Sequence, residues 1–171
     1  MKIINLNPNQ IITLNDYPIR NEQILKLYFR MAQGENKLVP PCPVIHKDLV
    51  INNFDTKLRT AFNKFYKKNT KAEYFLLDGS HKTTALNLAH IKISAMVFES
   101  DKDIQEARKL VDNGKLISLT TGKDIRIEIN ELKKHFNKNK RFETVEEKTN
   151  RLVKDKKVPK YMVSSFRSRS R

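Results

Sequence analysis

The stretch Glu73-Tyr-Phe-Leu-Leu-Asp-Gly-Ser-His-Lys-Thr-Thr-Ala-Leu-Asn-Leu-Ala-His90 predicts a strand that breaks over a glycine into a helix. Residues 74–77 form a continuous apolar and aromatic run, which is typical of a short buried strand. Gly79 predicts a sharp turn, because glycine adopts positive φ without a steric cost. From about residue 81 to residue 89, apolar residues recur at helical spacing. We expect this strand, turn and helix to be the central unit of the fold.

The start of the predicted helix has the features of an anion-binding site. Its first backbone N–H groups have no partner within the helix, and the helix dipole makes this end positive. After Gly79 come five side chains in a row that can donate hydrogen bonds to phosphate: Ser80, His81, Lys82, Thr83 and Thr84. Gly79 and these five residues therefore predict a phosphate-binding site, although they do not form a Walker loop. The alternative is a capped helix whose polar first turn faces water.

The segment Asp78-Gly79-Ser80-His81-Lys82-Thr83-Thr84-Ala85 resembles the D-G-x-H-R-x-x-A box of the ParB/sulfiredoxin superfamily. This superfamily includes nucleotide-binding domains of chromosome-partitioning proteins, sulfiredoxins and free-serine kinases. Three other segments resemble family elements in the same order: 6–10 (N-P-x-Q), Gly34 with 39–45 (G-x-x-x-P-I-x-V), and 113–122 (a T-T element of the serine-kinase branch). The resemblance covers residues 1–125.

Two positions depart from the family pattern. Lys82 stands where the family usually has arginine, so a bidentate phosphate contact becomes a single point charge. Ser80 stands where sulfiredoxins place their catalytic cysteine, which argues against a sulfinic-acid reductase.

The resemblance to the serine-kinase branch implies candidate catalytic residues. Glu22 matches by position the acidic residue that serves as the base in that branch, and Asp16 is a rival. Asp78 is a candidate to hold Mg²⁺ beside the phosphates of ATP or ADP, or to orient the acceptor. His81 is the third catalytic candidate. In the structural alternative, Glu22 only complements a helix dipole and Asp78 only caps the turn.

The order of the expected elements predicts a compact α+β domain, because strands and helices interleave without a long parallel βαβ series. The family resemblance implies a mixed sheet with flanking helices. We expect a nucleotide-binding domain over 1–125, a basic helical extension over 126–163 and a disordered tail over 164–171. An amphipathic helix at about 54–68 is interpreted as an insertion, either a solvated cover for the sheet or a basic docking surface.

The remaining pattern predicts elements along the whole chain. We expect strands at 2–6, 10–14, 44–50 and 91–99, the last of them half-buried, and helices at about 21–34, 103–113, 125–137 and 145–156.

The charge of the chain is strongly positive and uneven. The net charge is +15, and residues 126–171 hold 15 Lys/Arg and 6 Asp/Glu, a net +9. This excess suits a polyanionic partner such as DNA or RNA, although lysine-rich usage is also typical of a low-GC genome. The candidate contacts in the extension are Lys133, Lys134, Lys138, Lys140 and Arg141.

The composition also predicts the size of the core, the absence of a membrane partner and the cellular compartment. A hydrophobic content of 39% and a mean hydropathy of −0.61 allow a modest core. No apolar run reaches about 18 residues, so we expect no membrane partner. The single cysteine, Cys42, is consistent with a reducing cytoplasm.

Two functions from different classes fit these patterns. The first is a small ATP- or ADP-dependent phosphotransferase or nucleotide hydrolase, with serine or another small hydroxyl compound as acceptor in the kinase case. The second is a nucleotide-gated or non-specific nucleic-acid-binding module of the ParB type. A nuclease ranks lower, because the sequence shows no clear carboxylate cluster for two metal ions.

Overall fold

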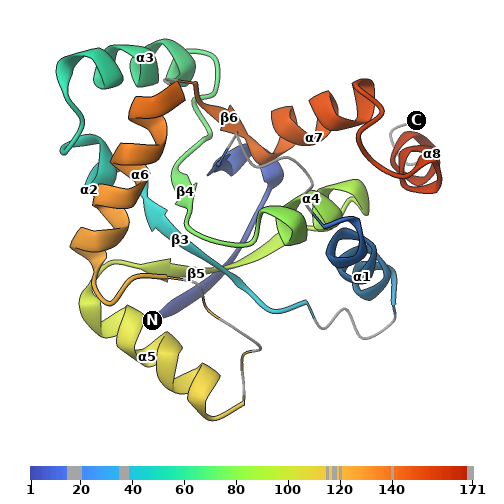
Figure 1. Ribbon diagram of the computed structural model, residues 1–171, viewed down its shortest axis with the longest axis horizontal. Helices are drawn as coiled ribbons and strands as arrows, with labels where there is room; N and C mark the ends of the chain where they lie inside the picture. Colours follow the sequence, from blue (N-terminus) through green and yellow to red (C-terminus); the bar gives the residue numbers. More distant parts are fainter. Residues whose placement is uncertain are drawn as a thin grey trace.

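The computed structural model of the protein describes residues 1–14, 21–34, 39–114, 116, 119, 121–139 and 141–168. Figure 1 shows a central sheet with helices packed around it. The elements follow in the order β1 (Lys2–Leu6), the 3-10 turn η1 (Pro8–Gln10), β2 (Ile11–Thr13), α1 (Glu22–Gln33), β3 (Cys42–His46), α2 (Lys47–Ile51), α3 (Thr56–Tyr66), β4 (Tyr74–Leu76), α4 (Ser80–Leu88), β5 (Ile93–Phe98), α5 (Asp101–Asp112), α6 (Ile125–Asn139), β6 (Glu143–Thr144), α7 (Val145–Lys154) and α8 (Lys160–Ser168).

The sheet has six strands in the order β1-β5-β3-β4-β2-β6. It is mixed, since β5 with β3 and β4 with β2 are parallel and the other three pairs are antiparallel. This arrangement confirms the predicted α+β class. Because β2 and β4 run in the same direction, the loops that follow them leave the same edge of the sheet.

Two hydrophobic clusters lie on opposite faces of the sheet, as the alternation of side chains along a strand requires. In β4, for example, Leu76 belongs to one cluster and Phe75 to the other. The Leu76 cluster is covered by α1, α4, α7 and α8. The Phe75 cluster is covered by α2, α3, α5 and α6 (Figure 1). The amphipathic helix predicted at 54–68 is α3, and its Leu58 and Phe62 are buried against the sheet.

The predicted break from strand to helix is confirmed. β4 ends at Leu76, and α4 begins at Ser80 after Gly79, which has a φ of +101°. Almost all of α4 is buried, because α1, α7 and α8 pack around it as well as the sheet. The buried residues of α4 therefore include polar ones, Lys82, Thr83, Thr84 and Asn87, as well as apolar ones.

Two strand predictions need correction. The strand expected at 44–50 ends at His46, whose Nδ1 accepts a hydrogen bond from the Asp48 backbone N–H (3.4 Å) and so caps α2. The strand expected to be half-buried, β5, is buried on both faces. Its Ala95 and Val97 face one cluster, and its Met96 and Phe98 face the other. A central strand between two helical layers has no solvent face, which the sequence pattern did not reveal.

The segment that we set apart as an extension shares the sheet and both clusters with the rest of the chain. β6 pairs with β2, Phe136 of α6 lies in one cluster and Leu152 of α7 lies in the other. The expected disorder at 164–171 is wrong for its first five residues, since α8 continues to Ser168. A buried residue of that helix, Met162, anchors it in the core. Among the described residues, no helix is both long enough and apolar enough to cross a membrane.

Phe136→Ala should destabilise the protein by about 3–5 kcal/mol, because a fully buried ring would be replaced by a cavity. Phe136 contacts the rings of Phe75 and Phe142, with centroids 5.6 and 4.5 Å away. Ile127→Ala, on a partly exposed position of the same helix, is the matched control and should cost much less. Chemical denaturation measures both. A loss for Phe136→Ala as small as that for the control would contradict the integration of α6 into the core.

Candidate functional site

The turn between β4 and α4 is held by its own backbone and by close packing. The carboxylate of Asp78 accepts a hydrogen bond from the Gly79 N–H (2.7 Å), and the Thr83 N–H donates to the Gly79 carbonyl (2.8 Å) to start the helix. A Cβ atom on Gly79 would lie 3.2 Å from the Cys42 Sγ. Positive φ and this close approach together require glycine. The capping role that we considered for Asp78 is therefore present in the structure.

Three of the five predicted phosphate donors point into the protein. The hydroxyls of Thr83 and Thr84 donate to the Ser80 carbonyl (3.2 and 2.8 Å), and that of Thr83 also reaches the Gly79 carbonyl. Lys82, predicted as a phosphate donor, is buried, and its side chain turns back toward the start of β3. Ser80 and His81 are the two residues of the set that remain partly exposed.

Lys82 is only 8% exposed. Its ammonium donates to the Pro41 carbonyl (3.1 Å) and lies 5.8 Å from the centre of the Tyr28 ring. Burial is possible because the carbonyl and the ring face both interact favourably with a cation. In this arrangement Lys82 ties α4 to the entry of β3 and to α1, with its Cε beside Gly79, and a second residue places a positive charge at Ser80.

That residue is Lys148 of α7, which the sequence analysis missed. It is 2% exposed, and its ammonium donates to the Ser80 hydroxyl (2.7 Å) and to the Leu14 carbonyl (2.9 Å). It therefore places a buried positive charge at the first residue of α4. No local pattern marks Lys148, because it lies 68 residues from Ser80 in the sequence. The one sequence signal was the Thr144–Glu147 capping box, which predicted the helix that carries it.

His81 lies at the same end of α4 and faces α1. Its Nε2 accepts a hydrogen bond from the Asn21 N–H (3.4 Å), which assigns the ring proton to Nδ1 in the neutral form. Burial lowers the pKa of His81 below its ordinary value, and the nearby charge of Lys148 lowers it further, while Asp78 acts in the opposite direction. His81 is thus held neutral as an acceptor in the free protein.

Asp78, Ser80 and His81 lie together around the start of α4, whereas the carboxylate of Glu22 is paired with a lysine of its own helix. Glu22 starts α1, next to Asn21, and its carboxylate forms an ion pair with Lys26 on the same helix. Its side chain is 57% exposed, as a first-turn residue facing solvent. The rival base, Asp16, lies outside the described residues. Among the described residues, no group of three or more His, Cys, Asp or Glu side chains is placed to hold a metal ion.

Two of the basic residues predicted as nucleic-acid contacts have acidic partners in the structure. Lys134 is paired with Glu131 (2.6 Å), and Arg141 is hydrogen-bonded to the buried carboxylate of Glu143. Lys140 lies outside the described residues. Lys133 and Lys138, like Lys134, are on α6.

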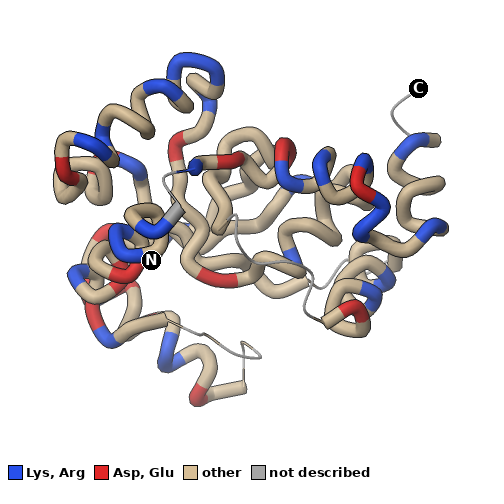
Figure 2. The backbone as a smooth tube through the Cα atoms, turned by 45° about the horizontal axis from the view of Figure 1, so that its top comes forward, with Lys and Arg blue, Asp and Glu red and all other residues tan. Residues whose placement is uncertain are grey.

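A different group of basic residues is exposed at the end of α7 and along α8. Figure 2 shows several Lys and Arg there, and the exposed Asp155 lies among them. The exposed members are Lys154, Lys156, Lys157, Lys160 and Arg167.

No family model, curated protein or solved structure matches this chain. The resemblance to the ParB/sulfiredoxin superfamily therefore remains a prediction that depends on the segments quoted above. The geometry of the turn, of Lys148 and of His81 is independent of that resemblance.

His81 should titrate below its ordinary pKa of 6.5. Because the unfolded chain then binds a proton more readily than the folded one, this histidine should lower the stability of the fold as the pH falls below about 6.5. NMR titration of the ring protons measures the midpoint directly. In His81→Gln, stability should fall less steeply between pH 7.5 and pH 5.5 than in the wild type. A midpoint at or above 6.5 would show that the ring is not held in the buried, Lys148-facing position.

Proposed function

We propose that the protein binds the phosphates of a nucleoside di- or triphosphate at the start of α4. The observation that carries this proposal is the buried ammonium of Lys148 at the Ser80 hydroxyl. The positive end of the helix dipole and the first-turn N–H groups, which have no partner within the helix, favour an anion at the same place. Ser80 and His81 supply the remaining hydrogen-bonding groups.

In this proposal, the binding of an anion changes the hydrogen bonds of His81 and Lys148. A phosphate next to the ring favours the protonated form, which can donate to phosphate from either nitrogen. Protonation removes the acceptor for the Asn21 N–H, so binding is coupled to the contact between α1 and α4. Phosphate oxygens also accept hydrogen bonds from the Lys148 ammonium, next to the Leu14 carbonyl and the Ser80 hydroxyl.

We further propose that the bound nucleotide is ATP or ADP and that its terminal phosphoryl group is transferred to a small hydroxyl compound such as serine. Asp78 fits a Mg²⁺ site of the type in which one carboxylate and the substrate phosphates share the ion. Such a bound Mg²⁺ would neutralise charge on the phosphates. Glu22 is the proposed base: it takes the hydroxyl proton of the acceptor while the phosphoryl group moves to the acceptor oxygen. Hydrolysis is the same reaction with water as acceptor.

The alternative is a nucleotide-gated or non-specific nucleic-acid-binding module, located in the cytoplasm like the proposed enzyme. The exposed basic group at the end of α7 and along α8 supports it, since solvent-accessible Lys and Arg side chains are the groups that neutralise nucleic-acid phosphates. α7 also carries Lys148, so the helix that would contact nucleic acid is the one that contributes to the proposed nucleotide site.

Lys148→Met should weaken nucleotide binding by about 1.5–3 kcal/mol, because one charge-assisted contact to phosphate is lost while the aliphatic stem is kept. Lys154→Met, on the exposed side of the same helix, is the matched control and should bind like the wild type. Calorimetry with ATP, ADP, CTP and GTP in the presence of Mg²⁺ measures the affinities. For the wild type, ligand at about 100 Kd should add roughly 2.7 kcal/mol of stability. If none of the four nucleotides binds, or if both variants bind equally well, the proposed site is wrong.

Glu22→Gln should reduce phosphoryl transfer by about 10²–10⁴-fold and leave nucleotide affinity nearly unchanged, because it removes a base and no phosphate contact. Lys26→Met is the control, since it removes the partner of Glu22 in the free protein but keeps the carboxylate. Mass spectrometry of ATP or ADP incubated with L-serine and other hydroxyl compounds detects the product. Transfer that persists in Glu22→Gln would assign the base to another residue. No transfer at all, combined with salt-sensitive nucleic-acid binding, would favour the alternative.

A further inference from the structure

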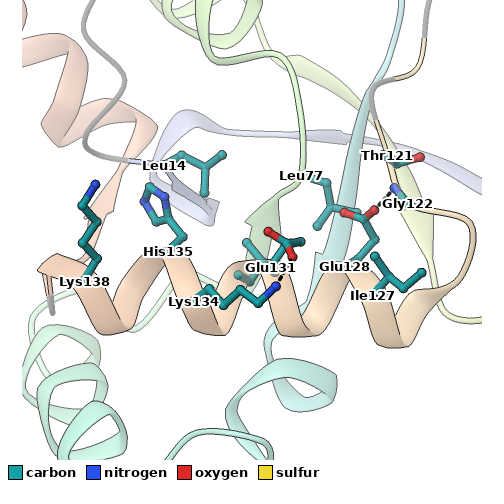
Figure 3. Close-up of a pocket in the computed structure, with 11 residues that line it drawn as sticks. Leu14, Leu77, Thr121, Gly122, Ile127, Glu128, Glu131, Lys134, His135 and Lys138 are labelled. Atoms are coloured by element: carbon teal, nitrogen blue, oxygen red, sulfur yellow. Dashed lines mark hydrogen bonds and ion pairs between the residues drawn. The ribbon is translucent and has the colours of Figure 1, made fainter.

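A second site lies beyond the ends of the same two parallel strands, on the side of α6. Leu14 and Leu77 directly follow β2 and β4, and both line a pocket of about 640 Å³. Figure 3 shows the pocket between these residues, the loop at Thr121 and Gly122, and one side of α6. Its volume is in the range of small-molecule sites, which occur preferentially outside the carboxyl ends of strands. The phosphate site proposed above does not use this space.

The pocket has an acidic end. Glu128 is 7% exposed, its carboxylate accepts a hydrogen bond from the Gly122 N–H, and Glu131 follows one turn later on the same side of α6. In Figure 3 the Glu128 carboxylate lies at Gly122, the Glu131 carboxylate lies between Glu128 and His135, and His135 and Lys138 lie toward Leu14. Two carboxylates at one end attract a cation, and a buried one attracts it most strongly because water screens it least.

The surroundings of Glu128 favour a further positive charge. Burial raises the pKa of this carboxyl, and the charges of Glu131 and Asp124 raise it further, while the Gly122 N–H and the charge of Arg108 lower it. The Arg108 guanidinium is directed at the Thr121 and Gly122 carbonyls (2.7 and 2.8 Å), so it stabilises the loop. A carboxylate in such a place gains more from a bound cation than a solvated one does.

The rest of the lining indicates what the uncharged part of the ligand is. Leu14, Leu77 and Leu132 form apolar walls that can bury an alkyl stem. The ion pair between Glu131 and Lys134 is at the surface, where a ligand cation can displace Lys134 at little cost.

From these contacts we propose that this pocket binds a small primary amine, with its ammonium between Glu128 and Glu131 and its apolar stem against Leu14 and Leu77. The ammonium donates to the two carboxylates. This site is separate from the proposed nucleotide site and does not depend on it.

The test uses three probes of the same length on the full chain: hexylamine, 1-hexanol and hexanoate. Hexylamine should cause saturable shifts of the backbone amides of Gly122, Glu128 and Leu132 in NMR spectra, and 1-hexanol should bind at least tenfold more weakly. Glu128→Gln keeps an oxygen for the Gly122 N–H and removes the charge, so it should weaken hexylamine binding at least tenfold. Lys134→Ala, which frees Glu131, should bind hexylamine as well as the wild type or better.

Several results would overturn this proposal. The pocket would be a general apolar cavity if 1-hexanol bound as tightly as hexylamine, and an anion site if hexanoate bound more tightly. Unchanged affinity in Glu128→Gln, or no saturable shift at about 10 mM hexylamine, would exclude the amine site. If Glu128→Gln does not fold, the comparison of the three probes and the map of shifted amides in the wild type still decide the outcome.

Discussion

The ammonium of Lys148 lies between the Leu14 carbonyl and the Ser80 hydroxyl, and thereby joins α7 to the end of β2 and the start of α4. Removing such a charge from water costs several kcal/mol unless hydrogen bonds and nearby charges offset the loss. The position of α7 is fixed accordingly, with Thr144 capping it and Val145 and Leu152 in the core. The proposed phosphate site depends on this one side chain more than on any residue of the local motif.

The left-handed turn at Gly79 is the second constraint, and it acts together with Lys148. Positive φ turns the chain sharply between β4 and α4, and the absence of a side chain lets Cys42 and Lys82 pack against the turn. Because β2 and β4 are parallel, the same edge of the sheet also carries Leu14 and Leu77. One edge therefore presents two separate regions: a positive region at the start of α4 and a pocket with an acidic end against α6. Their opposite electrostatic character predicts ligands of opposite charge.

Much of the local structure was predictable from the sequence because its signals are local. The apolar run before Gly79 predicted β4, the spacing after it predicted α4, and the capping box at Thr144 predicted α7. The α+β class followed from the order of such elements. Predictions about exposure were among those that failed. Lys82 was predicted as an accessible phosphate donor and lies buried over the Tyr28 ring, and β5 was expected to be half-buried and is buried on both faces.

The sequence by itself determined where the chain turns, where most helices begin, and that a helix start rich in polar residues follows a buried strand. Only the tertiary structure decided which of those polar residues face outward and which distant residues join them. Lys148 and Glu128 acquire their roles from neighbours far away in the sequence or from burial, and neither is encoded in a local pattern. The physical reason is that the energy of a charge depends on the dielectric and the partners around it, which exist only once the layers have packed.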